Sequence, residues 1–217
     1  PLWDVLSNLV TDFPQTKAVP HMWQWEKVKE HVLTAGEVIT AEEAERRVLV
    51  LENPGMKGES KITDTLYAGL QLILPGEIAP SHRHTQSALR FVIEGKGAYT
   101  TVDGEKTTML PGDFIITPSW TWHDHGNESS DPMIWLDGLD IPIINQFTSS
   151  FAEKLGQKRQ VLQKPEGDSL ARYGSGLLPV NNTISSEKVS PVFSYPFSRT
   201  REALEKIKDN EEWDKSH

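Results

Sequence analysis

Apolar and polar side chains alternate along residues 65–74, with the period of two that a β-strand requires. One face of this strand is purely apolar, because Leu66 and every second residue up to Leu74 is Leu or Ala. The opposite face mixes polar and apolar side chains, and its members are Thr65, Tyr67, Gly69, Gln71 and Ile73. An apolar outer face and a mixed inner face predict a small barrel whose interior holds a ligand.

Short strand-like runs, each closed by turn residues, continue as far as residue 139. Asp103 and Gly104 lie between two such runs, which is typical of a two-residue hairpin turn. The regular spacing predicts an all-β sandwich or barrel. The other turn signals are Pro75-Gly76, Gly95-Lys96-Gly97 and Pro111-Gly112.

The segment that precedes this β region predicts two helices and one strand. Residues 23–33 place Trp25 and two valines on one helical face. Thr40 and Glu43 have the spacing of a capping box, which predicts the start of a short helix. Residues 47–51 form a strand-like run that an Asn-Pro-Gly turn closes.

The segment that follows the β region is rich in Ser, Gly, Pro and Lys and predicts an extended arm over residues 146–198. Within the arm, residues 151–155 predict a short helix. Residues 199–213 predict a charged helix whose narrow apolar side carries Leu204 and Ile207. The expected organisation is a helical segment with a first strand, a β domain, and an arm with a helix, over residues 1–60, 61–145 and 146–217.

Composition excludes several classes of function. The chain has 217 residues and a formal net charge of −9, which disfavours a nucleic-acid or anionic-membrane surface. No segment approaches the roughly 20 apolar residues that a membrane helix needs. Because there is no cysteine, disulfides, thiolate nucleophiles, iron–sulfur clusters and zinc fingers are excluded. The lack of disulfides fits a cytoplasmic protein, which is the expected location.

Two His-x-His pairs are the candidate chemistry of the β region. His82 and His84 share one face of an extended segment, and so do His123 and His125. One such pair is common by chance, but two pairs in one short β domain favour a metal site. Imidazole suits Fe, Zn, Cu and Ni, and a facial ligand set with open positions is typical of non-haem Fe(II) oxygenases.

The residues around both pairs resemble the two cupin motifs. Gly76 precedes His82-Arg83-His84 and Gly95 follows it, while Gly112, Pro118, His123 and Asn127 resemble the second motif. The resemblance implies a mainly β cupin fold, a double-stranded β-helix or jelly-roll barrel. It selects three neutral metal ligands, His82, His84 and His123. Two positions depart from the pattern: Ala88 replaces the usual ligand glutamate, and Trp120 replaces a glycine.

The longer stretches Asp64–Gly95 and Pro111–Asn127 resemble gentisate 1,2-dioxygenases. These are bicupin iron enzymes, some of whose relatives act on salicylate or 1-hydroxy-2-naphthoate. The resemblance implies one Fe(II) per subunit, a small aromatic hydroxy-carboxylate and dioxygen as substrates, and ring opening of gentisate to maleylpyruvate. It also implies a homotetramer and a second cupin domain, so that this chain is the N-terminal half of a bicupin.

Two arginines are candidate anchors for the substrate carboxylate. Arg90 lies two positions after Ala88 and therefore points to the same side of its strand. Its guanidinium could instead pair with Asp137, a carboxylate within an apolar run. Arg46 is the second candidate by family likeness, and the alternative is a solvated charge run with the neighbouring glutamates.

Four further residues are candidates for substrate contact or proton transfer. Tyr67 and Gln71 lie on the mixed strand face and could donate hydrogen bonds to substrate, or could be satisfied core residues. By resemblance, Asp137 lies near the substrate hydroxyl and could accept its proton. His125 is expected next to the ligands, as a donor toward substrate or dioxygen.

Three alternatives remain open at the level of sequence. The substrate could be salicylate or 1-hydroxy-2-naphthoate in place of gentisate. Three histidines also suit Zn, Ni or Mn. Finally, the chain could be a cupin fragment that binds a metal or a ligand without turnover.

Overall fold

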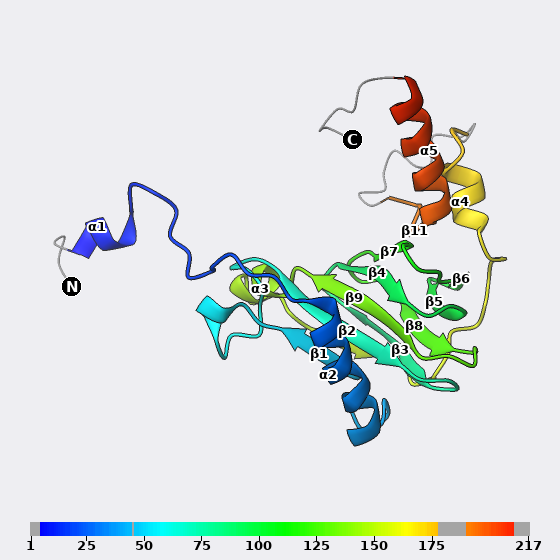
Figure 1. Ribbon diagram of the computed structural model, residues 1–217, viewed down its shortest axis with the longest axis horizontal. Coiled ribbons are helices and arrows are strands. Elements are labelled where there is room, and N and C mark those ends of the chain that lie inside the picture. Colours follow the sequence, from blue (N-terminus) through cyan, green and yellow to red (C-terminus); the bar gives the residue numbers. More distant parts are fainter. Residues whose placement is uncertain (1–4, 45, 178–189, 211–217) are drawn as a thin grey trace.

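Two antiparallel β-sheets pack face to face at the centre of the computed structural model, which describes residues 5–44, 46–177 and 190–210 (Figure 1). The six-stranded sheet has the order β1 (Val48–Leu51), β2 (Tyr67–Ile73), β9 (Met133–Leu139), β4 (Ala88–Glu94), β7 (Phe114–Thr117) and β11 (Ser194–Tyr195). The five-stranded sheet has the order β10 (Ala152–Lys154), β3 (Ile78–His84), β8 (His123–Asn127), β5 (Ala98–Val102) and β6 (Glu105–Thr108). The predicted β-sandwich or barrel is confirmed.

Helices occur at the two ends of the chain and between strands. The helices are α1 (Leu6–Leu9), α2 (Trp25–Val38), a 3-10 turn at Pro54–Met56, α3 (Ile141–Gln146), α4 (Asp168–Tyr173) and α5 (Phe197–Asn210). The predicted helix at residues 23–33 therefore exists as α2, and the predicted C-terminal helix exists as α5. Residues 211–213 of that prediction lie outside the described residues. None of the helices in the described part of the chain is long and apolar enough to cross a membrane.

The strand β2 separates two apolar clusters, as its alternating sequence predicts. Its inner face contributes Ile73 to the core between the sheets, together with Trp135 of β9 and Val102 of β5. Its outer face packs Leu70 and Leu72 against Val32 of α2. The helix thus covers the outside of the six-stranded sheet and leaves the barrel interior to the mixed face of β2.

Replacing Leu72 by alanine tests this packing. Leu72 is 1% exposed, so its truncation leaves a cavity between β2 and α2. We expect the free energy of unfolding to fall by about 2–5 kcal/mol, measured by urea denaturation. Val38→Ala at the end of α2 is the control, because Val38 is 79% exposed and its truncation should change stability by less than about 0.5 kcal/mol. Equal effects of the two substitutions would contradict the assigned core.

The hairpin predicted at Asp103 and Gly104 joins β5 to β6, with Val102 opposite Glu105. Both turn residues have positive φ, 43° and 76°. This matches the two-residue turn that the twist of antiparallel strands favours, and it accounts for Asp and Gly at these positions.

Two local predictions need correction. Residues 151–155 are not a helix, because β10 pairs with the edge of β3, and Arg83 forms an ion pair with Glu153. A run this short is not a stable helix alone, so long-range strand pairing prevails. Thr40 and Glu43 do exchange the capping-box hydrogen bonds, but only a turn follows them.

Candidate metal centre

Strands β3 and β8 lie side by side and carry all four histidines of the two His-x-His pairs. His82 lies directly opposite His123 in the register of the two strands. His84 and His125 follow on the same inner faces, because side chains two positions apart point the same way. All four side chains are buried, and His123 and His125 are fully inaccessible to solvent.

His82, His84 and His123 form a compact cluster. Their ligand nitrogens all lie within 4.8 Å of one another. The ring centroid of His123 is 4.0 Å from that of His82 and 4.7 Å from that of His84. Such spacing lets three imidazoles converge on one ion.

Backbone carbonyl groups fix the tautomer of each ring in the cluster. The Nδ1–H groups of His82, His84 and His123 donate to carbonyl oxygens at distances of 2.9, 2.8 and 3.0 Å. The acceptors belong to Pro80, Gln86 and Thr121. Each Nε2 atom therefore keeps its lone pair, which is the state that a metal ligand needs.

Burial keeps the three rings neutral. It lowers the pKa of His82 to about 3 and that of His84 to about 4, and the positive charge of Arg46 acts in the same direction. Burial also brings the pKa of His123 well below its ordinary value. The Nε2 atoms of His82 and His123 are buried and have no hydrogen-bond partner among the described residues. Unpaired, neutral nitrogens that converge fit a divalent metal ion.

His125 lies beside this cluster and outside the group of three. Its ring centroid is 5.7 Å from that of His123, and its Nδ1 atom lies 2.9 Å from the hydroxyl of Thr100. Within the described part of the chain its Nε2 atom is buried without a partner. His125 therefore lies next to the three candidate ligands, as predicted. Its role as a donor toward substrate or dioxygen stays a prediction.

Arg90 and Asp137 face each other on β4 and β9 and form a buried ion pair. The Arg90 Nε atom is 3.4 Å from Asp137 Oδ1, which also accepts a hydrogen bond from the Trp135 indole. Arg90 Nη1 donates to the hydroxyl of Thr117. Burial raises the pKa of Asp137, and the Arg90 guanidinium opposes that rise. The structure therefore contains the Arg90–Asp137 ion pair that was the alternative to substrate binding by Arg90. Binding of the substrate carboxylate by Arg90 stays a prediction.

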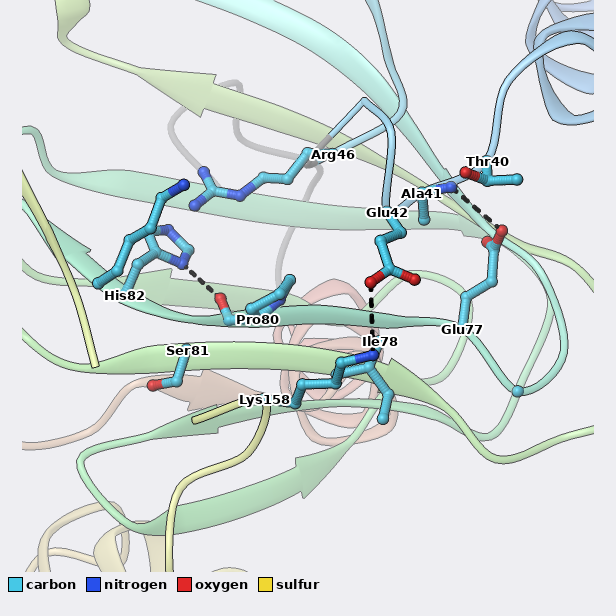
Figure 2. A pocket seen from close by; sticks show the side chains of 12 residues that line it. Thr40, Ala41, Glu42, Arg46, Glu77, Ile78, Pro80, Ser81, His82 and Lys158 are labelled. Carbon is cyan, nitrogen blue, oxygen red and sulfur yellow. Dashed lines mark hydrogen bonds and ion pairs between the residues drawn. The ribbon is translucent and has the colours of Figure 1, made fainter. Parts of the chain in front are cut away.

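Two adjacent arginines take different directions. Arg47 is buried and donates to both carboxylate oxygens of Glu77, at 3.0 and 2.7 Å. Arg46 lines a cavity of about 500 Å³ together with His82 and Pro80. Figure 2 shows the Arg46 guanidinium extending toward His82. The structure thus brings Arg46 to the cluster of three histidines, as the resemblance implies. Arg47 instead holds the segment before β1 to the sheet.

Tyr67 and Gln71 lie on the inner face of β2, as the alternation predicts. Gln71 is 2% exposed and is paired with Trp135 of β9 in the strand register. Burial raises the pKa of Tyr67 to about 12, and the charge of Asp137 contributes to this rise. Tyr67 therefore stays a neutral phenol that can donate a hydrogen bond.

Sequence reasoning missed two hydroxyl groups of the site. Thr100 contacts His125, and Thr117 binds Arg90. Threonine is frequent in strands, so neither position stands out in the sequence. Only the placement of the adjacent strands could have identified them.

Comparisons with known proteins give one consistent result. Residues 69–139 match the family described as "Cupin domain". The chain is 59% identical over its full length to gentisate 1,2 dioxygenase 1 of Aquipseudomonas alcaligenes and covers 62% of that protein. It is 43% identical to a gentisate 1,2-dioxygenase of Ralstonia sp, over 94% of this chain and 57% of the relative.

A solved structure is also similar. It is salicylate 1,2-dioxygenase from Pseudoaminobacter salicylatoxidans as an adduct with gentisate, with a TM-score of 0.87 and 37% identity. The match covers 96% of this chain and 58% of that one. The chain thus spans less than two thirds of the length of the relatives that it matches. In fold and sequence, the chain is thus similar to gentisate and salicylate 1,2-dioxygenases, and residues 69–139 match the cupin domain.

Proposed function

We propose that this protein is an Fe(II)-dependent dioxygenase of gentisate. It opens the aromatic ring between the carboxyl-bearing carbon and the adjacent hydroxyl-bearing carbon and yields maleylpyruvate, with both atoms of dioxygen incorporated. The observation that carries the proposal is the cluster of three buried, neutral histidines in a chain 59% identical to a gentisate dioxygenase. The homotetramer and the cytoplasmic location remain predictions from the resemblance.

The nitrogen atoms of His82, His84 and His123 would hold one iron ion. When bound, Fe(II) supplies the Lewis-acid and redox chemistry that ring opening by dioxygen requires. Position 88, where most cupins carry a ligand glutamate, is Ala88 in β4, so the three histidines leave the ion its full positive charge. An anionic hydroxy-carboxylate is the substrate class that such a centre favours.

The side chains around the cluster bind and orient the substrate in this proposal. Arg46, which reaches the cluster through the cavity, binds the carboxylate, and Arg90 is the second anchor. Tyr67 and Gln71 donate hydrogen bonds to substrate oxygens. Asp137 accepts the proton of the substrate hydroxyl, and His125 donates toward substrate or dioxygen. Gln71, Arg90, His125 and Asp137 are buried, which excludes water and strengthens the contacts proposed for them.

Oxygen uptake by the Fe(II)-loaded protein tests the reaction. We expect uptake on addition of gentisate and none with hydroquinone, which lacks the carboxylate that the arginines are proposed to bind. Uptake with salicylate or 1-hydroxy-2-naphthoate as well would reveal a broader pocket. Bound iron without uptake on any of these rings would contradict the proposal and favour a cupin that binds without turnover.

A further inference from the structure

The segment after β10 crosses the outer face of the five-stranded sheet. We call residues 155–164 the crossing segment. Its backbone bonds to Ser81 of β3 at Leu155 and Lys158, and to Gly104 of the β5–β6 turn at Gln163 and Lys164. One stretch of chain thus ties β3 to the turn between β5 and β6, and it passes over β8 between them.

Asp124 is the point where this segment meets β8. It lies between His123 and His125 in β8. Because side chains alternate along a strand, its side chain points away from the cluster of histidines and toward the crossing segment. The carboxylate is fully inaccessible to solvent. Gln160 donates to Asp124 Oδ2 from both its backbone and its side-chain nitrogen, each at 3.0 Å. A buried carboxylate needs such donors, because desolvation of an uncompensated charge is costly.

The Gln160 side chain also binds β5 and the hairpin turn. Its Nε2 atom donates to the Thr101 carbonyl at 3.2 Å, and its Oε1 atom accepts from the Gly104 backbone at 3.0 Å. One amide therefore connects three places on the sheet. A backbone shift of Asp124 would move His123 and His125 directly, since the three residues are consecutive in the strand.

The strand before the crossing segment supports the other half of the cluster. In β10, Ala152 pairs with His84 and Lys154 pairs with His82. The same arm of the chain is therefore bonded to both strands that carry the histidines. One support is the pairing of β10 with the edge of β3, and the other acts on β8 from the face of the sheet opposite the histidine side chains.

We propose that Gln160 is a positioning residue of the metal centre, which acts through Asp124 on the orientation of His123. The inference concerns metal binding and does not depend on which ring the protein cleaves. Loss of a group that hydrogen-bonds a metal ligand directly typically weakens metal binding by roughly 10- to 100-fold. Gln160 acts one contact further out, so we expect an effect at the lower end of this range.

The chain offers a matched control at a second buried carboxylate. Glu105 of β6 is 2% exposed and accepts hydrogen bonds from the Ser169 backbone and hydroxyl. Ser169 belongs to α4, which follows the crossing segment, so this contact also ties the arm to the sheet. Strand β6 carries no histidine, and loss of this contact should affect stability alone.

Cobalt titration of the folded protein compares Gln160→Ala with Ser169→Ala. We expect Gln160→Ala to bind Co(II) about 10-fold more weakly and to change the visible absorption of the bound ion. Ser169→Ala should lower the melting temperature and leave the cobalt affinity within about twofold. Gln160→Met, which keeps the length of the side chain but removes its polar groups, should behave like Gln160→Ala and replaces it if that variant does not fold.

Unchanged cobalt affinity and absorption in a folded Gln160 variant would overturn the inference. An equal loss of affinity in Ser169→Ala would do the same, because it would show a general effect of loosening the arm. The titration needs no aromatic substrate. Absence of ring cleavage by the unsubstituted, Fe(II)-loaded protein would therefore count against the proposed function only and would leave the comparison of cobalt affinities unaffected.

Discussion

Replacing His123 by alanine is expected to abolish metal binding and the proposed ring cleavage together. His123 is fully buried, its Nδ1–H donates to the Thr121 carbonyl, and its Nε2 atom faces His82 and His84. Removing it leaves two imidazoles, which are too few to hold the ion in place. Metal affinity should fall by more than about 100-fold, beyond the range that loss of an outer contact produces.

His125→Ala is the matched control for this prediction. It truncates the same residue type on the same strand face, two positions away. Metal content should remain, whereas the rate of ring cleavage should fall because His125 is the proposed donor toward substrate or dioxygen. Metal analysis by mass spectrometry and oxygen uptake, both on protein shown by circular dichroism to be folded, measure the two effects. A His123→Ala protein that retains its metal would refute the ligand assignment.

Strand alternation and turn preferences make part of the fold and of the site predictable from the sequence. Alternation along a strand is a local property, so the sequence alone placed Gln71 and Ile73 inside the barrel. The same rule put the two histidines of each pair on one face. The hairpin at Asp103 and Gly104 needed only the turn preference of those residues.

Contacts between distant strands could not be predicted in this way. The pairing of Arg90 with Asp137 depends on the register of β4 against β9, which no local pattern encodes. The local sequence of residues 151–155 favours a helix, but β10 forms there because its pairing partner, the edge of β3, lies far away along the chain. The capping box at Thr40 forms without a following helix, since Arg47 binds Glu77 and the Ile39 carbonyl and thereby draws the chain back to the sheet.

Breaking the Arg90–Asp137 pair is expected to have the largest effect on stability. Both side chains are almost completely buried, so loss of one leaves the other as an uncompensated charge. Asp137→Leu or Arg90→Met should each lower the free energy of unfolding by about 3–5 kcal/mol. The double variant should regain most of this loss, because a buried ion pair can be replaced by apolar side chains of similar volume at little net change. Urea denaturation of the four proteins measures the coupling between the two positions.

The double variant then separates the structural role of Arg90 from its proposed role as an anchor. With stability restored, anaerobic titration compares the binding of gentisate and of hydroquinone to the metal-loaded protein, so that the proton transfer proposed for Asp137 does not enter. If Arg90 binds the carboxylate, gentisate should bind roughly 10- to 100-fold more weakly, as expected for loss of a charged hydrogen bond, and hydroquinone should be unaffected. An unchanged preference for gentisate would mean that Arg90 serves the fold alone. In that case Arg46, which lines the cavity beside His82, would be the remaining candidate to bind the carboxylate.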